Sequence, residues 1–299
     1  MTNSLLTMRG RDFLSISDLD REELLGILDL AARIKAGEWR ERPLTGKQVA
    51  MVFQKPSMRT RVSFQVGITR LGGATIALAE GDVQIGVREP VADAARVLER
   101  YVDLVVARLR RHADLVELAH SASIPVINAL TELEHPCQVL ADLMTIRERC
   151  GSLEAPVAFV GDGNNIVTSL AHAHALLGFP FTVVTPPGYE PSEALRRVAP
   201  GMQVSNYLNA VAGAKVIYTD VWTSMGFEDE TQQRRSDFSG YKVDAALMER
   251  APGAVFLHCL PAHRGEEVSD EVIDGPASAV FDQAENRLHA QMALMALIS

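Results

Sequence analysis

Cysteine is scarce in this chain, which has only Cys137, Cys150 and Cys259 among 299 residues. The set is odd in number, and no two members have the C-x-x-C spacing of structural zinc sites. A sparse, odd set also argues against a framework of disulfide bonds. We therefore expect reduced thiols and no structural zinc.

Long apolar runs are also absent, although 47% of the residues are hydrophobic. No stretch approaches the roughly 20 uninterrupted apolar residues that a membrane span needs. The first segment, MTNSLLTMRGRDFL, lacks the apolar core and cleavage site of a secretory signal. We expect a soluble protein without a membrane partner, located in the cytoplasm.

Positive charge is in deficit, with 29 Lys and Arg against 38 Asp and Glu and a net charge of -9. This balance opposes nonspecific binding to nucleic acid. One local basic cluster, ARLRRH, occupies 107–112. We expect Arg110 and Arg111 of this cluster to lie on the solvated edge of a helix. The sequence therefore predicts no nucleic-acid partner.

Strand-like and helix-like segments alternate along the chain, as is typical of parallel β-sheets. The length exceeds that of one usual α/β unit. We predict an α/β protein of two domains, 1–149 and 150–284, each a parallel sheet flanked by helices. An amphipathic helix over 18–36 opens the fold with Asp18 as N-cap, and helix 285–299 packs back on the first domain. The expected strands are 48–53, 74–79, 104–108, 125–130, 156–161, 181–186, 203–207, 215–220 and 254–261.

The segment QKPSMRTRVSF (54–64) gathers cations directly after a predicted strand. Ser57 falls in the N-cap region of the next helix, with Arg59 and Thr60 in its first turn. Free backbone N–H groups, the positive helix end and a forked guanidinium together favour a phosphate. Taken alone, the segment is also explained by a capping serine beside surface arginines.

Further motifs lie at predicted strand ends or helix starts, where α/β proteins bind ligands. They are HPCQ (135–138), GDGNN (161–165), DVWTSMG (220–226), HCLPAHRGEE (258–267) and AENR (284–287). With SMRTR (57–61), they resemble the ornithine carbamoyltransferases in order and over essentially the whole chain. S-x-R-T-R and H-P-x-Q are shared with aspartate carbamoyltransferases, whereas D-x-W-x-S-M-G and H-C-L-P are typical of the ornithine branch.

The resemblance implies that residues 1–149 bind carbamoyl phosphate and residues 150–284 bind L-ornithine, with no metal or organic cofactor. It implies four catalytic residues, Arg108, His135, Asp220 and Cys259. The residues that it implies for carbamoyl phosphate are Ser57, Met58, Arg59, Thr60, Gln84, Arg108, His135, Gln138, Cys259, Leu260 and Arg287. Met58 departs from the family's usual threonine, and we expect its backbone N–H to bind phosphate nonetheless.

His135 and Gln138 form an i, i+3 pair at a helix start, with Pro136 in the first turn. The resemblance implies that both contact the carbamoyl group and that Arg108 bridges phosphate and carbonyl oxygen. Alone, His135 is explained as a helix cap or a core histidine. Together with Arg108 and the phosphate segment, it is interpreted as functional.

For ornithine, the resemblance implies binding by Asn165, Asp220, Ser224 and Met225. Asn165 and the Met225 backbone would hold the α-carboxylate, while Asp220 and Ser224 would accept from the α-ammonium. Asn164 is expected to serve mainly as a turn former. Trp222 is expected to pack in the core.

GDGNN superficially resembles a dinucleotide-binding loop, because Gly161 and Gly163 follow a strand and precede a helix. Ile166 occupies the position of the third glycine, and the next strand, 181–186, does not end in the acidic residue that binds a ribose. We therefore reject nicotinamide binding.

Cys259 beside His258 and His263 also suggests a thiol hydrolase or a metal site. Adjacent strand residues point to opposite faces, so His258 is poorly placed to activate Cys259. The resemblance instead implies that Cys259 bonds near the δ-amine with Asp220, and that Leu260 and Arg287 contact the carbamoyl group. His263 and Arg264 receive no role.

The segment DVQIGVREP (82–90) resembles a loop that this family donates across a subunit interface, with Gln84 as a phosphate contact. This implies an oligomer, a homotrimer or an assembly of trimers, with shared sites. Arg88 is either a further contact or part of a solvated turn.

The sequence thus predicts transfer of a carbamoyl group from carbamoyl phosphate to the δ-amine of L-ornithine, in arginine biosynthesis. Two alternatives stay open: a carbamoyltransferase for aspartate, putrescine or an acylated ornithine, and a catalytically silent phosphometabolite-binding subunit. The direction of the reaction in metabolism does not follow from the residues.

Overall fold

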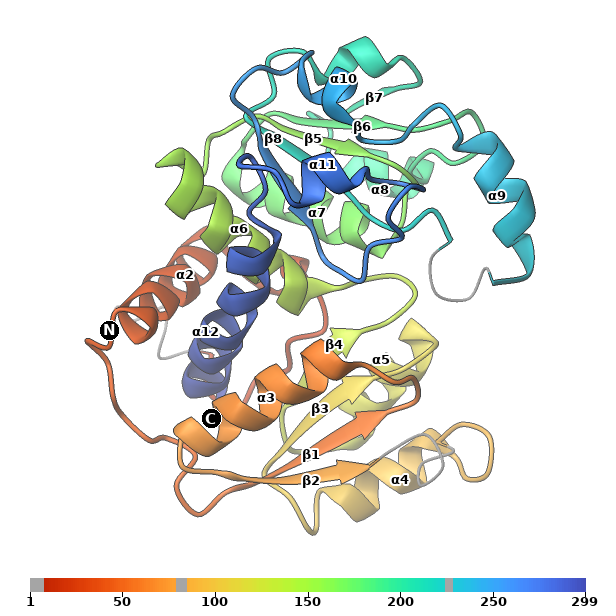
Figure 1. The fold of residues 1–299 in the computed structure, drawn as a ribbon. Helices are drawn as coiled ribbons and strands as arrows, with labels where there is room; N and C mark the ends of the chain where they lie inside the picture. Colours follow the sequence, from red (N-terminus) through yellow and green to blue (C-terminus); the bar gives the residue numbers. More distant parts are fainter. Residues whose placement is uncertain (1–7, 79–84, 224–227) are drawn as a thin grey trace. The chain divides into compact units, whose positions relative to one another are not determined.

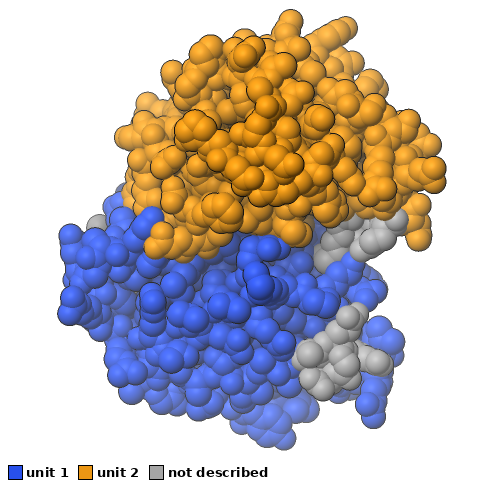
Figure 2. All heavy atoms as spheres, in the orientation of Figure 1, with its two compact units in different colours: residues 1–140, 287–299 blue, residues 141–286 orange. Residues whose placement is uncertain are grey.

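The structure is a computed structural model that describes residues 8–78, 85–223 and 228–299. The chain forms two compact units, coloured separately in Figure 2. Unit 1 comprises residues 1–140 and 287–299, and unit 2 comprises residues 141–286. Each unit contains one parallel β-sheet flanked by helices (Figure 1), which confirms the predicted α/β class.

Unit 1 contains a four-stranded sheet in the order β2-β1-β3-β4. Its strands are β1 (Gln48–Phe53), β2 (Ala74–Leu78), β3 (Leu104–Arg108) and β4 (Val126–Leu130). Its helices are the 3₁₀-helix η1 (Ile16–Asp18), α2 (Arg21–Lys35), α3 (Met58–Arg70), α4 (Val91–Leu98) and α5 (His112–Ser121). All four strands lie where the sequence predicted them.

Alternate residues of the unit 1 strands face different helices. Ala50 and Val52 of β1 belong to the apolar cluster that includes Leu115 and Leu118 of α5 and Ala94 of α4. Since strand side chains alternate in direction, the neighbouring β1 residues face the opposite side of the sheet. One face of the sheet is therefore covered by α4 and α5.

The first long helix begins two residues later than predicted. Asp20, and not Asp18, is the N-cap of α2, and its carboxylate accepts from the Glu23 N–H at 2.8 Å. Asp18 ends η1 and accepts from the Leu14 and Ser15 N–H groups at 2.7 and 2.9 Å. Two acidic residues two positions apart could each cap a helix, and the preceding 3₁₀ turn decides between them.

Unit 2 contains a five-stranded sheet in the order β7-β6-β5-β8-β9. Its strands are β5 (Val157–Val160), β6 (Phe181–Val184), β7 (Gln203–Ser205), β8 (Val216–Thr219) and β9 (Val255–His258). Its helices are α7 (Asn165–Leu177), α8 (Glu193–Val198), η2 (Leu208–Val211), η3 (Glu228–Glu230), α9 (Thr231–Asp237), α10 (Ala245–Met248) and α11 (Asp270–Ile273). These five strands begin at or within one residue of their predicted starts, but β9 ends at His258, three residues before the predicted end at Pro261.

The unit 2 sheet is covered on both faces. Val160, Ile217 and Phe256 join a cluster with Leu247 of α10 and with residues of α11. On the other face, the α7 residue His174 lies with its ring centroid 6.3 Å from that of Phe181 in β6. Strands buried on both faces explain their nearly continuous apolar runs.

Two helices contain the boundaries between the units. Both α6 (Pro136–Cys150) and α12 (Val280–Ile298) begin on one side of a boundary and end on the other. Residues 287–299 belong to unit 1, where Met292 of α12 would lie 3.1 Å from a Cβ added to Gly67 of α3. A glycine in α3 thus permits close approach of α12. None of the helices within the described ranges is long and apolar enough for a membrane span.

Candidate active site

Each sheet has one position where the strand order reverses. The chain leaves β1 for β2 on one side and returns to β3 on the other, and likewise leaves β5 for β6 before β8. In open parallel sheets, ligands bind beyond the carboxyl ends of the strands at such a position. The predicted motifs follow or end these strands: SMRTR follows β1, Arg108 ends β3, GDGNN follows β5 and Asp220 follows β8.

The segment after β1 forms the predicted helix start. Ser57 is the N-cap of α3, and its hydroxyl accepts from the Thr60 N–H at 3.3 Å. Met58 is 72% exposed, so its thioether is not a core group, and its backbone lies in the first turn. The remaining N–H groups of this turn and the adjacent Arg59 can bind an anion.

Arg287 of α12 connects two predicted residues of unit 1. Its Nη2 donates to the Thr60 hydroxyl at 2.6 Å, and its Nη1 donates to the Gln138 side-chain oxygen. Arg287 is 3% exposed, Thr60 is 1% exposed and Gln138 is fully buried. Three side chains that are distant in sequence are thereby held together at the start of α3 and α6.

His135 lies among cations of this cluster. Burial is the main cause that holds the pKa of His135 well below its usual value of 6.5, and Arg287, Arg108 and Arg59 lower it further. The imidazole is therefore neutral at physiological pH, able to donate one hydrogen bond without carrying charge. The register between β3 and β4 shifts at Arg108, an irregularity that reorients a side chain at a strand end.

The buried thiol nearby is not a nucleophile. Cys137 follows Pro136 in α6 and donates from Sγ to the Asn128 carbonyl at 3.3 Å. Burial raises the pKa of Cys137 to about 12. At neutral pH this cysteine stays protonated and serves the core of unit 1.

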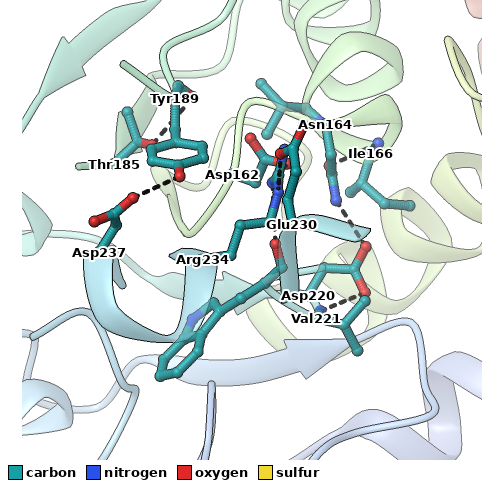
Figure 3. Close-up of polar contacts among 12 residues, drawn as sticks. Asp162, Asn164, Ile166, Thr185, Tyr189, Asp220, Val221, Glu230, Arg234 and Asp237 are labelled. Atoms are coloured by element: carbon teal, nitrogen blue, oxygen red, sulfur yellow. Dashed lines mark hydrogen bonds and ion pairs between the residues drawn. The ribbon is translucent and has the colours of Figure 1, made fainter. Parts of the chain in front are cut away.

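The GDGNN turn of unit 2 presents Asn164 to the Asp220 carboxylate (Figure 3). Asn164 caps α7, accepting from the Ile166 and Val167 N–H groups, and its side-chain amide donates to Asp220 at 2.8 Å. Asn165 is the first residue of α7 and is 8% exposed. Asn164 was predicted mainly as a turn former, and the structure adds its contact with Asp220.

Asp220 is a junction at the carboxyl end of β8. Its Oδ1 accepts from the Cys259 thiol at 3.0 Å and from the Val221 N–H at 2.8 Å, while Oδ2 accepts from Asn164. Asp220 as a whole is 8% exposed. The predicted partners Asp220 and Cys259 are therefore in direct contact, and the remaining acceptor capacity can bind an ammonium group.

His258 supports the turn that carries Cys259. The Leu260 N–H donates to His258 Nδ1 at 2.8 Å, so the other ring nitrogen carries the proton and donates to Glu267 at 3.1 Å. Leu260 has a left-handed φ of 58°, a conformation that surrounding contacts must maintain, and its bond to Pro261 is cis. Because β9 ends at His258, strand alternation does not separate the two side chains, and a His258 ring nitrogen lies within 4.8 Å of the Cys259 sulfur. Both ring nitrogens are instead engaged by Leu260 and Glu267.

Within the described residues, two clusters of unit 2 bring together side chains that could ligate a metal. The ligand atoms of Asp220, His258 and Cys259 lie within 4.8 Å of one another, but both nitrogens of His258 are engaged in hydrogen bonds. In the second cluster, formed by His263, Glu266 and Glu267, Glu266 pairs with Arg235 and Glu267 with His258. Ligation by His258 would break a bond that holds the Leu260 turn, so this donor set fits a metal poorly.

Several supporting residues carried no signal in the sequence. Gln54 accepts from the Arg110 N–H at 2.9 Å and donates to the Ile85 carbonyl at 3.0 Å, joining two loops of unit 1. Arg234 donates to Asp162 in the GDGNN turn at 2.6 Å (Figure 3). The contacts of Arg234 and Gln54 join distant segments. Arg234 lies in no motif named above, and Gln54 begins the 54–64 segment but was given no role there.

Three predicted residues lie outside the described residues. They are Gln84 in unit 1 and Ser224 and Met225 in unit 2. Arg88 is exposed, and Arg264 pairs with Asp270 and Asp274 on the surface of unit 2.

Comparison with known proteins covers nearly the whole chain. Residues 11–148 match the carbamoyl-P binding domain of aspartate/ornithine carbamoyltransferase, and residues 154–298 match its Asp/Orn binding domain. The chain belongs to the aspartate/ornithine carbamoyltransferase family.

Members of this family with similar sequences are named ornithine carbamoyltransferase. The protein from Symbiobacterium thermophilum is 52% identical over 98% of this chain and 99% of its own length. The protein from Methanothermobacter thermautotrophicus is 50% identical over 95% of this chain and 97% of its own length.

Solved structures of the family are similar over the same extent. Ornithine carbamoyltransferase from Pyrococcus furiosus has a TM-score of 0.93 and 48% identity, with 97% of both chains covered. The enzyme from Thermus thermophilus has a TM-score of 0.89 and 44% identity, covering 96% of this chain and 99% of that one. The fold and the family therefore agree with the resemblance found in the sequence.

Proposed function

We propose that this protein is an ornithine carbamoyltransferase, which transfers the carbamoyl group of carbamoyl phosphate to the δ-amine of L-ornithine, giving L-citrulline and phosphate. The observation that carries the proposal is the buried Asp220 carboxylate, which Asn164 and Cys259 contact at the end of β8. Relatives of about 50% identity over nearly the full length bear the same name.

Carbamoyl phosphate binds to residues of domain 1–149 in this proposal, with Arg287 added from the last helix. The α3 start supplies Ser57, the Met58 backbone, Arg59 and Thr60 to the phosphate, joined by Gln84. Arg108 bridges the phosphate and the carbonyl oxygen, where a positioned cation stabilises developing negative charge. His135 and Gln138 donate to the carbamoyl group, which Cys259, Leu260 and Arg287 also contact.

L-Ornithine binds to domain 150–284. Asn165 and the Met225 backbone hold its α-carboxylate, while Asp220 and Ser224 accept from its α-ammonium. A carboxylate at the centre of this site favours a cationic amino acid and disfavours aspartate, whose side chain carries a second negative charge. Putrescine lacks the α-carboxylate, so Asn165 would lose its partner.

The chemistry requires a neutral δ-amine for attack and a leaving phosphate that takes the amine proton. Thr60, Arg108 and neutral His135 stabilise the oxyanion that forms on the carbamoyl group. Holding both substrates in reactive geometry supplies most of the acceleration. The catalytic residues in this scheme are Arg108, His135, Asp220 and Cys259, without a metal or organic cofactor.

The assembly and the cellular role complete the proposal. We infer a cytoplasmic homotrimer in which the 82–90 loop of one subunit completes the phosphate site of its neighbour. The enzyme would act in arginine biosynthesis. A silent phosphate-binding subunit would not need the Asp220, Cys259 and His135 set, so the active enzyme is favoured.

One experiment tests the activity directly. Purified protein is incubated with carbamoyl phosphate and, separately, L-ornithine, putrescine, N-acetyl-ornithine and L-aspartate, and each carbamoylated product is quantified. We expect kcat/KM for ornithine to exceed that for the other amines by at least about 100-fold. The reason is that hydrogen-bonding groups of the site lose their partners when an analogue lacks or alters the α-ammonium or α-carboxylate group. A higher value for any other amine, or no product at all, would reject the assignment.

A further inference from the structure

Arg234 of α9 is a buried cation in unit 2, with only 4% of its surface exposed. Its Nη1 donates to Asp162 at 2.6 Å and to the Trp222 carbonyl at 3.1 Å. Its Nε donates to Glu230 at 2.9 Å, and the guanidinium carbon lies 5.0 Å from the centre of the Tyr189 ring. The planar fork of arginine allows all these contacts at once, which lysine does not.

Two of these contacts hold the segments that carry the ornithine-binding residues. Asp162 lies in the turn after β5, and its carbonyl accepts from the Asn164 N–H at 2.7 Å. Trp222 stands two residues after Asp220. Arg234 thus forms hydrogen bonds with both the turn that contains Asn164 and the segment that contains Asp220. Figure 3 shows Asn164 and Asp220 in contact with each other.

The charges around Arg234 support the same role. Burial raises the pKa of Asp162, and Asp220 raises it further, whereas Arg234 opposes both effects. Two carboxylates therefore lie close enough to repel each other, with the guanidinium beside one of them. Loss of this cation would favour protonation of a carboxylate or separation of the two segments.

Docking of α9 does not by itself explain a buried arginine. Phe238, the residue that follows α9, is fully buried and lies against Tyr189 and Trp222, with ring centroids at 4.6 and 6.0 Å. The Tyr189 hydroxyl also donates to Asp237 at 2.7 Å. Replacing a buried ion pair by apolar side chains is often neutral or stabilising. The Arg234–Asp162 pair is therefore better explained by the fixed positions it gives to the segments it joins than by stability.

We propose that Arg234 is a positioning residue for ornithine, which acts by keeping Asn164 and Asp220 in the arrangement that binds the α-ammonium group. This inference rests on the proposed function, because it names a determinant of affinity at the same site. Arg234 itself contacts neither reacting group.

The kinetic test compares three variants. Arg234→Gln removes the charge and the fork, Arg234→Lys keeps the charge, and Arg235→Gln is the matched control because Arg235 forms an exposed pair with Glu266. For Arg234→Gln we expect the KM for ornithine to rise about tenfold or more, with the KM for carbamoyl phosphate within about twofold of wild type. Arg234→Lys should recover part of the loss, and Arg235→Gln should match wild type.

A second measurement needs no substrate. In a Cys150→Ser background, where Cys137 is fully buried, iodoacetamide reports on Cys259, whose thiol proton is held by Asp220. We expect Arg234→Gln to raise the alkylation rate about fivefold, because a hydrogen bond of ordinary strength is lost. If the wild type makes no citrulline, the proposed function fails while this measurement still tests the positioning role.

The decisive outcomes are separate. If Arg234→Gln folds poorly, Asp162→Asn removes the same ion pair with little change in shape and takes its place in both assays. The inference is wrong if the folded variant equals Arg235→Gln in both the ornithine KM and the alkylation rate. It is also wrong if both substrates' KM values rise equally, since that would indicate a general structural role.

Discussion

At the scale of single residues, the unit 1 cluster shows how cations are arranged around a neutral group. Arg287 contacts Thr60 and Gln138. Burial lowers the pKa of His135 most, and among the charges Arg287 has the largest effect, followed by Arg108 and Arg59. Positive charge gathered in a buried place suits a dianionic phosphate. A neutral histidine beside it can donate to a carbonyl oxygen without competing for that phosphate.

The depressed pKa of His135 predicts how stability depends on pH. The folded state keeps His135 neutral, whereas the unfolded chain binds a proton below its usual pKa of 6.5. The unfolded state thus binds more protons in mildly acidic solution, so stability falls as pH drops below 6.5. His135→Gln should reduce this pH dependence by up to about 1.4 kcal/mol per pH unit between pH 6.5 and 5.5.

Denaturant unfolding of wild type and variant across this range checks the prediction. His120→Gln is the control because His120 is exposed in α5. Parallel stability curves for wild type and His135→Gln would show that His135 is not held neutral in the folded protein.

At the scale of elements, the turn between β5 and α7 determines where Asn164 and Asn165 lie, beside the proposed ornithine site. The Gly163 N–H donates to the Tyr189 carbonyl at 2.9 Å. A Cβ at Gly163 would lie 2.7 Å from the Pro191 nitrogen and 2.9 Å from the Glu190 carbonyl carbon. The glycine is therefore needed because another backbone segment passes directly beside it.

Gly163→Ala is expected to displace this turn. The added methyl group overlaps backbone atoms, which cannot move as freely as a side-chain end, so unfolding should be easier by about 1–3 kcal/mol. The ornithine KM should rise, since Asn164 and Asn165 follow directly, while carbamoyl phosphate binding should be unchanged. Thermal unfolding and kinetics for both substrates measure these effects.

Gly240→Ala supplies the comparison, because a Cβ there meets no atom within 4 Å. If Gly163→Ala has the stability and the ornithine KM of wild type, the 189–191 segment moves aside without loss of stability. The turn would then not depend on glycine.

At the scale of the whole molecule, each unit carries one cluster at its own reversal of strand order. The same architecture in two units gathers cations in unit 1 and a carboxylate in unit 2. A two-substrate transferase needs one site for each substrate. The proposed trimer adds a third contribution, Gln84 from a neighbouring subunit.

The shared site predicts that two inactive variants complement each other. If Arg59→Ala and Gln84→Ala each inactivate the trimer, any ring that contains both kinds of subunit has one interface with an intact Arg59 and an intact Gln84. Random exchange at equal amounts should restore about a quarter of wild-type activity, because three quarters of the rings are mixed and each has one intact site in three.

Citrulline formation before and after subunit exchange is the measurement, with exchange verified by differently tagged subunits. A mixture that exchanges but stays inactive would place Gln84 and Arg59 in the same subunit's site or remove Gln84 from the mechanism.

The sequence alone was sufficient for local structure and for the family. Apolar patterns located the nine strands that the described residues form, the sequence placed Ser57 at a helix N-cap, and the ordered motifs indicated the family. These features depend on residues close together in the sequence, so their periodicity and capping residues can be identified without the structure. Even here, the prediction of Asp18 as the N-cap was wrong, because Asp20 caps α2.

The supporting contacts required the folded chain. Arg287 and Thr60 are 227 residues apart, and Arg234 and Asp162 are 72 apart. No local pattern marks either arginine as a partner, and strand order is likewise not encoded by the position of each strand. These contacts form only where folding buries distant segments against each other. The neutral state of His135 and the contacts of Asp220 with Asn164 and Cys259 arise in the same way.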